Sequence, residues 1–196
     1  MPEPREGVER FDRAIAAIDA ANADDPNTIV VRGEGRPKEL AHAELVSEWV
    51  VSLQPDASEA LRLAARAHHL RRWTVPRTSY PAGRAGYLRW RRDLHEQHAR
   101  EVGEILQGVG YDDATIARVQ DLVRKRGLGK DPEVQTLEDA LCLVFLETQF
   151  HDLAARLDRD KLDGVVAKTL KKMSPEAIAR VADLDLTDDA RALLAR

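Results

Sequence analysis

The sequence predicts an all-α protein, and three observations support this fold class. Apolar residues recur at helical spacing in nearly every segment, and strict alternation is confined to the short run Thr-Ile-Val-Val at 28–31. The 196 residues are 43% hydrophobic and 33% charged, with only 11 Gly and 9 Pro, which excludes a disordered or low-complexity chain. Cys142 is the single cysteine, which excludes a disulfide framework. We therefore expect a helical bundle with one hydrophobic core.

The first three helices are separated by segments rich in Gly, Pro and Asn. We expect the first helix over 8–22, followed by an extended loop over 24–37 that carries Asn, Gly and Pro. The second helix, over 38–53, ends shortly before a proline. The third, over 57–73, ends at a loop over 74–83 that contains two prolines and a glycine.

The second half of the chain has clear helix signals. A long helix over 84–107 ends near two glycines, and Asp112 and Asp113 cap the next helix, over 113–126. The helix over 133–157 is the most apolar and should run through the middle of the bundle. Three further helices are expected, over 159–173, over 175–182 and after Thr187.

The positive charge of the chain is concentrated in one segment. Residues 62–92 contain nine arginines and no Asp or Glu, although the whole chain has a formal net charge of −4. Four of the nine aromatic residues lie in the same segment. Guanidinium groups bind phosphate in a bidentate manner, and arginines interleaved with aromatics are typical of nucleotide or single-stranded nucleic acid binding. The alternative is that these arginines pair with acidic helices elsewhere in the fold.

Helical spacing places several polar side chains on apolar faces. His42, His68 and His98 each share a face with aliphatic residues, and Asp139 shares its face with leucines of the most apolar helix. Histidines in such positions are usually hydrogen-bonded core residues, and Asp139 could pair with an arginine. However, imidazoles and a carboxylate that converge from different helices are also how a metal site is built inside a bundle.

Short strings in the chain resemble an uncharacterised conserved family known as a domain of unknown function. These strings are HHLRRW, SYPAGRAGYLRWR and LEDALCLVFLE.

A weaker pattern of spacing resembles the HD-domain superfamily of metal-dependent phosphohydrolases. The segment LAHAELVSEWV contains His42, and LAARAHHLRRW contains the doublet His68-His69. His98 begins a segment that resembles the intermediate helices, and LEDALCLVFL supplies Asp139.

The HD resemblance covers about residues 40–146 and implies a fold. We expect an HD-domain-like helical bundle with extra N- and C-terminal helices, which forms a single all-α domain over 1–196. Its HD-like core would span about 36–157, preceded by a helix and loop over 1–35 and followed by a helical appendage over 158–196.

The same resemblance implies a metal site formed by His42, His68, His69, His98 and Asp139. His69 stands where the superfamily has an aspartate that contacts both metals, and a paired histidine of the intermediate helices is missing. We therefore expect one divalent transition metal, with His68 and His69 as alternative ligands. Histidine and carboxylate ligands suit Fe, Mn, Co, Ni or Zn.

The function implied is metal-dependent hydrolysis of a phosphate ester or nucleotide, with arginines that bind the phosphate and aromatics that stack on a base. The expected binding residues are Arg71, Arg72, Arg84, Tyr87, Trp90 and Arg91. One alternative is a non-catalytic module that binds an anion, a nucleotide or RNA through residues 62–92. Another is an oxygenase with an iron centre, since some HD-like proteins are oxygenases.

We expect neither a signal peptide nor a membrane span. Its N-terminus is polar and acidic, and its longest apolar run, over 140–146, is far shorter than the roughly 18 residues that a membrane helix needs. We expect a cytoplasmic protein that has no membrane partner and binds a phosphorylated small molecule, a nucleotide or RNA.

Overall fold

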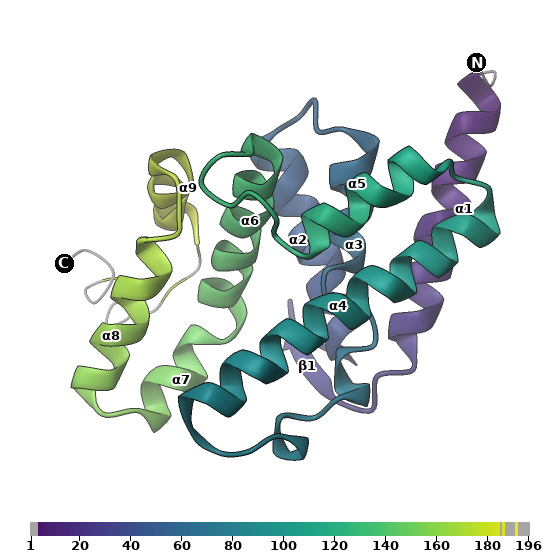
Figure 1. Cartoon of the computed structure of the whole chain (residues 1–196). Coiled ribbons are helices and arrows are strands. Elements are labelled where there is room, and N and C mark those ends of the chain that lie inside the picture. The colour runs from purple at the N-terminus through teal and green to yellow at the C-terminus, as the bar shows by residue number, and fades with distance from the viewer. Residues whose placement is uncertain (1–3, 185, 187–190, 192–196) are drawn as a thin grey trace.

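A computed structural model describes residues 4–184, 186 and 191, and it confirms the all-α fold class (Figure 1). The helices within this part of the chain are α1 (Pro4–Ala23), α2 (Lys38–Leu53), α3 (Glu59–Ala67), α4 (Gly83–Val109), α5 (Asp113–Val123), α6 (Pro132–Thr148), α7 (Phe150–Arg156), α8 (Arg159–Leu170) and α9 (Pro175–Arg180). Short 3-10 turns lie between α3 and α4, namely η1 (Arg72–Thr74) and η2 (Arg77–Ser79), and after α9, namely η3 (Val181–Asp183). The helix expected after Thr187 lies outside the described residues.

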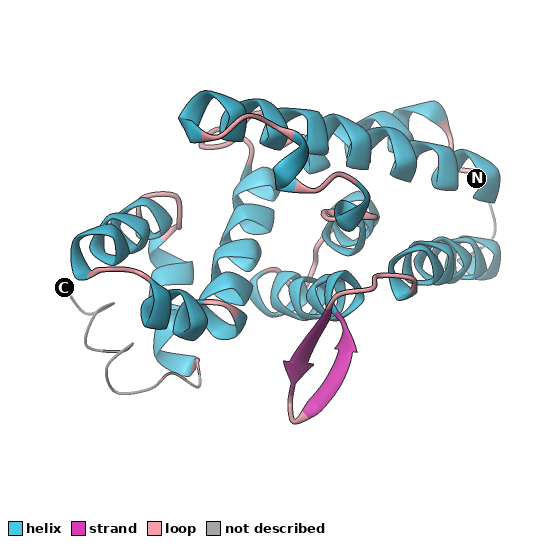
Figure 2. Cartoon of the chain, turned by 90° about the horizontal axis from the view of Figure 1, so that it is seen from below, coloured by secondary structure: helices cyan, strands magenta, loops and turns pink. Residues whose placement is uncertain are grey.

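The segment over 24–37, predicted as a loop, contains an antiparallel hairpin that projects from the helices (Figure 2). Strands β1 (Thr28–Val31) and β2 (Glu34–Pro37) pair from end to end. Arg32 and Gly33 form the two-residue turn between them, and both have positive φ, as tight hairpin turns require. The second strand was missed because its sequence, EGRP, has no apolar alternation.

The third helix is shorter than predicted, which changes the direction of the histidine doublet. Helix α3 ends at Ala67, and Arg71 then adopts a left-handed conformation with φ +49°. The Asn22 side chain stabilises this bend, because its Oδ1 accepts a hydrogen bond from the Arg71 backbone N–H at 3.0 Å. His69 therefore lies in the turn after the helix rather than on a helical face.

The single helix predicted over 133–157 is two helices. Helix α6 ends at Thr148, and α7 begins at Phe150 after a break at Gln149. Asp131 caps α6, since its Oδ1 accepts hydrogen bonds from the backbone N–H groups of Glu133 and Val134. No glycine or proline marks the break, so the sequence carried no signal for it.

The core has two parts that share α6. The larger part lies among α1–α6, and α2 packs against both α3 and α6. A smaller part joins one face of α6 to α7, α8 and α9. Its buried members include Cys142, Leu146, Phe150, Leu162 and Met173.

None of the described helices combines the length and the apolar character needed to cross a bilayer.

Candidate metal centre

Three ionisable side chains from two segments meet at the start of α2. Glu39 and His42 lie one helical turn apart on α2, and His69 approaches them from the turn after α3. One potential ligand atom from each of the three lies within 4.8 Å of those of the other two. The closest pair is His69 Nδ1 and Glu39 Oε2, at 3.0 Å. We call this group the Glu39–His42–His69 cluster.

The turn between α1 and β1 holds Glu39 in place. Its backbone N–H donates to Asp25 Oδ2 at 3.0 Å, and Asp25 Oδ1 accepts from the Asn27 backbone N–H at 2.9 Å. Asp25 thus satisfies one of the free N–H groups at the start of α2, where the helix dipole also favours a carboxylate such as Glu39. Glu39 was not predicted as a site residue, because an acid in the first turn is common in exposed helices, whereas this one is only 3% exposed.

Glu39 remains ionised although it is buried. Burial raises the pKa of a carboxyl group, but here the interactions of Glu39 with His69 and with the Arg72 guanidinium more than offset this effect and lower its pKa. The Arg72 guanidinium lies 3.6 Å from Glu39 Oε1. The cluster therefore contains one negative charge, with a cation on its outer side.

Neighbouring groups determine which nitrogen of His42 carries the hydrogen. The Thr148 hydroxyl donates its hydrogen to the carbonyl oxygen of Val144 at 2.7 Å, so Oγ1 accepts from His42 Nε2, which lies 3.3 Å away. The lone pair of His42 is then on Nδ1, the nitrogen that faces Glu39 at 3.8 Å. A metal ion at the cluster needs this lone pair on Nδ1.

Two further imidazoles flank the cluster with their orientation set by the backbone. His68 Nδ1 lies 2.8 Å from the carbonyl oxygen of Ala65, and His98 Nδ1 lies 2.8 Å from that of Leu70. A carbonyl can only accept, so both Nδ1 atoms carry a hydrogen and both Nε2 atoms keep a lone pair. His98 Nε2 is buried and has no hydrogen-bond partner among the described residues.

Burial keeps these imidazoles neutral. It lowers the pKa of His98 to about 3, and that of His69 to about 3 although Glu39 opposes this effect. The pKa of His68 is also well below its ordinary value, again because of burial. The ring centroid of His69 lies 4.2 Å from that of His68 and 6.0 Å from that of His98. Neutral imidazoles act as metal ligands or hydrogen-bond acceptors, which protonated ones cannot do.

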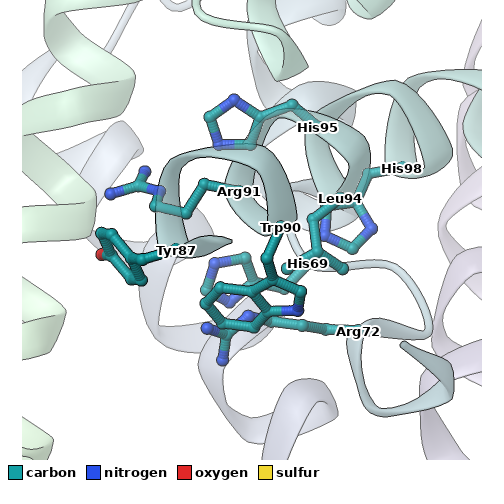
Figure 3. A pocket seen from close by; sticks show the side chains of 8 residues that line it. All are labelled: His69, Arg72, Tyr87, Trp90, Arg91, Leu94, His95 and His98. Atoms are coloured by element: carbon teal, nitrogen blue, oxygen red, sulfur yellow. The ribbon is translucent and has the colours of Figure 1, made fainter. Parts of the chain in front are cut away.

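A cavity of about 150 Å³ adjoins the cluster at His69 (Figure 3). Tyr87 and Arg91 lie on one side of it, and His98 and Leu94 lie on the other. The remaining lining residues are Arg72, Trp90 and His95. The cavity thus joins basic, aromatic and imidazole side chains next to a buried carboxylate.

Trp90 and Arg72 form one wall of the cavity. The Arg72 guanidinium carbon lies 5.1 Å from the centre of the Trp90 ring, within the range of a cation–π contact. Trp90 Nε1 donates to the carbonyl oxygen of Val75 at 2.9 Å, so the indole is fixed to the loop before α4. Burial lowers the pKa of His95, on the opposite wall, to about 4.

The structure brings four of the six predicted phosphate-binding residues to this cavity, namely Arg72, Tyr87, Trp90 and Arg91. Arg84 instead lines a larger neighbouring groove, together with Tyr87 and Arg91. Arg71 lies 3.6 Å from Glu101. Several other arginines of residues 62–92 also have internal partners: Arg66 pairs with Asp19, Arg77 with backbone carbonyls, and Arg89 and Arg92 with Asp93.

The structure does not bring Asp139 to the Glu39–His42–His69 cluster. Its Oδ1 accepts hydrogen bonds from Gln135 Nε2 at 3.0 Å and from the Ser174 backbone N–H at 2.8 Å. Asp139 is buried as predicted, but it faces α9 rather than the histidines. The residue of α6 that reaches His42 is Thr148, at the far end of the helix.

The donor atoms of the cluster fit a divalent transition metal. Two imidazoles and one carboxylate suit Fe, Mn, Co, Ni or Zn, and the carboxylate supplies charge compensation in a buried place. A metal ion that binds His69 through Nδ1 would take the place of its hydrogen bond to Glu39. The unpartnered His98 Nε2 beside His69 offers a further acceptor for a ligand of the metal or for water.

Comparisons with known proteins bear on the family of the chain. No curated protein and no solved structure is significantly similar to it, so the HD-domain resemblance stays a prediction. One family model, described as Domain of unknown function (DUF4202), matches residues 12–194. This match confirms the family resemblance of the strings HHLRRW, SYPAGRAGYLRWR and LEDALCLVFLE, and the chain belongs to the family described as Domain of unknown function (DUF4202).

Proposed function

We propose that the protein is a metal-dependent hydrolase of a phosphate ester or nucleotide. The Glu39–His42–His69 cluster carries this proposal, because its ligand atoms lie within 4.8 Å of one another next to a cavity lined by arginines. A metal ion here would have one carboxylate and two imidazole ligands, with His68 and His98 close by. Cations on the cavity wall would face the phosphate.

Three residues of the cavity have a part in this reaction beside the metal site. A bound divalent metal would lower the pKa of a water molecule toward neutrality and so supply hydroxide. Arg72 and Arg91 bind phosphoryl oxygens and offset the negative charge that develops during attack. The Nε2 lone pair of His98 accepts a hydrogen bond from the attacking water and orients it. Water adds its oxygen to phosphorus, the ester P–O bond breaks, and the alcohol leaves with a proton.

A second candidate function is oxidation at an iron centre. Two histidines and one carboxylate are also the ligand set of non-haem Fe(II) oxygenases. The arginines of the cavity favour phosphate chemistry over this reaction. Iron content together with dioxygen consumption would identify an oxygenase, whereas phosphate release without dioxygen consumption would identify a hydrolase.

A third candidate is a non-catalytic module that binds a nucleotide, RNA or another anion. It is supported by Arg84 and Arg91, which form no ion pair among the described residues. Such a module would bind nucleotide or RNA with a steep dependence on salt and without any need for a metal.

We infer that the protein acts in the cytoplasm on a phosphorylated small molecule or a nucleotide. Its single cysteine, Cys142, is free and buried, as is usual in a reducing compartment. Burial raises the pKa of the Cys142 thiol to about 12, so this thiol stays protonated and takes no part in the proposed reaction.

The test combines metal content with activity on a panel of phosphate esters and nucleotides. Purified protein should contain close to one transition metal ion per chain, measured by elemental mass spectrometry. Glu39→Gln and His42→Ala should lose both the metal and phosphate release. Glu48→Gln is the matched control, because Glu48 lies on the same helix but is exposed and pairs with Arg32. If the wild-type protein binds no metal and releases no phosphate, the proposal fails.

A further inference from the structure

A groove of about 940 Å³ is lined by the first turns of α4, the loop after α5, one side of α6 and the end of α8. It is several times larger than the cavity at His69. Its volume is at the upper end of the range for small-molecule sites, which is about 300–1,000 Å³. The proposed reaction at the cluster does not by itself need such a groove.

Cations surround this groove. Six of its lining residues are basic, namely Arg84, Arg91, Lys125, Lys168, Lys171 and Lys172, and Glu138 is the only acid among the described lining residues. Lys125 and Lys172 both pair with Glu138 and so neutralise it. The other four cations form no ion pair within the described part of the chain. The groove therefore has an unbalanced positive charge that attracts an anion.

The floor of the groove is mainly aliphatic. Its apolar lining residues are Leu88, Leu128, Leu141, Cys142, Phe145 and Val165. Leu88 is 53% exposed and Leu128 is 41% exposed, so both offer apolar surface to a ligand. Apart from Tyr87, Phe145 is the only aromatic lining residue among those described. A surface of this kind fits a flexible hydrocarbon chain better than a series of stacked bases.

The groove and the cavity beside the cluster share two lining residues. Tyr87 and Arg91 line both spaces, on consecutive turns of α4. The ring centroid of Tyr87 also lies 5.9 Å from that of Trp90, which lines the cavity. A ligand with its phosphate near Arg72 and Arg91 would therefore extend over Tyr87 onto the aliphatic floor.

We propose that the substrate is an amphiphilic phosphate ester whose aliphatic chain lies in this groove and whose phosphate lies in the cavity. This inference rests on the proposed phosphohydrolase function, since it names the substrate class of that same site. Lys168 and Lys171, at the end of α8, draw the anion to the groove. Arg91 binds it where the two spaces meet, and Leu88 and Leu128 cover the chain. Hydrolysis releases the aliphatic alcohol and inorganic phosphate.

Binding of alkyl phosphates to the full chain in EDTA tests the inference without any catalysis. Decyl phosphate below its micelle concentration should bind at least tenfold more tightly than hexyl phosphate in calorimetry, because each buried methylene tightens binding by about fourfold. Inorganic phosphate alone should bind more weakly than either. A ligand without the charge, decyl glucoside, should bind at least tenfold more weakly than decyl phosphate.

Matched variants locate the ligand. Leu88→Gln should weaken decyl phosphate at least fivefold, whereas Val51→Gln, at a similarly exposed site on α2, should not. Lys168→Gln with Lys171→Gln should weaken it several-fold at low salt, and Arg159→Gln with Lys161→Gln, on the same helix but outside the groove, should leave it unchanged.

The outcomes separate this inference from the proposed function. If Glu39→Gln removes the metal but leaves decyl phosphate binding intact, the groove has its own ligand, as we propose. Equal affinity for decyl and hexyl phosphate would overturn the inference even if metal and activity are present. Binding of anionic vesicles or of a single-stranded RNA oligonucleotide, without binding of monomeric decyl phosphate, would also overturn the inference.

Discussion

The buried neutral histidines should make the protein sensitive to mild acid. His98 is 1% exposed, and burial lowers its pKa to about 3, compared with about 6.5 in an unfolded chain. Between these two pH values the unfolded state binds a proton that the folded state does not. The stability contributed by the neutral ring is therefore fully present above pH 6.5 and is lost as pH falls toward 3. His68 acts in the same direction, since burial also lowers its pKa.

The size of the effect follows from these two pKa values. Well below pH 6.5, each imidazole that stays neutral in the folded state lowers the free energy of unfolding by about 1.4 kcal/mol for every unit by which the pH falls. For His98 alone, the free energy of unfolding should fall by about 2 kcal/mol between pH 7 and pH 5. This is a large fraction of the roughly 5–15 kcal/mol that stabilises a typical domain.

Urea unfolding followed by circular dichroism in EDTA measures this quantity at each pH. The informative variant is His98→Asn, whose side-chain amide can still donate to the carbonyl oxygen of Leu70 but does not titrate. The variant's loss of stability between pH 7 and pH 5 should be smaller by about 2 kcal/mol than that of the wild type. An identical loss in both proteins would refute the reasoning, because His98 would then not be buried as a neutral ring.

Three other substitutions test different parts of the structure. Asp131→Ala should cost about 1–2 kcal/mol of unfolding free energy at pH 7, because it removes the N-cap of α6 and the partner of Arg118. Since the pKa of Asp131 is lowered to about 2, this cost should persist above pH 4 and vanish toward pH 2. A cost that does not depend on pH would contradict this. Gly86→Ala should cost about 1–3 kcal/mol in the same assay, because its Cβ would overlap a carbonyl oxygen of the preceding loop, whereas Gly108→Ala on the same helix has open space and should be neutral or stabilising. Thr148→Val should lower metal affinity by about tenfold in a competition assay with a chelating dye, because His42 loses the partner that orients its ring. Unchanged affinity would contradict the assignment of the His42 hydrogen to Nε2.

Much of the fold follows from local sequence signals. The bounds of α2 agree with the prediction over 38–53, because turn residues mark both of its ends. The break at Gln149 and the early end of α3 were missed, since each depends on tertiary packing rather than on a glycine or proline. The Arg71 bend, for example, is stabilised by Asn22, which lies 49 residues earlier in the chain.

The site could be predicted only in part, and for a related reason. Helical periodicity correctly placed His42, His68 and His98 in the interior, because burial on one helix face is a local property. It could not show which helix a buried acid faces, so Asp139 was grouped with the histidines although it bonds to Ser174. Glu39 was missed because its partner His69 comes from another segment of the chain.

The most direct test of the metal centre is X-ray absorption on protein loaded with zinc or manganese, compared with Glu39→Gln. We predict about one metal ion per chain, with a ligand shell of nitrogen and oxygen that includes two imidazoles, at roughly 2.0–2.2 Å for zinc. The variant should lose the bound metal while it remains folded. Full metal occupancy in the variant, or a ligand shell without imidazole in the wild-type protein, would contradict the account.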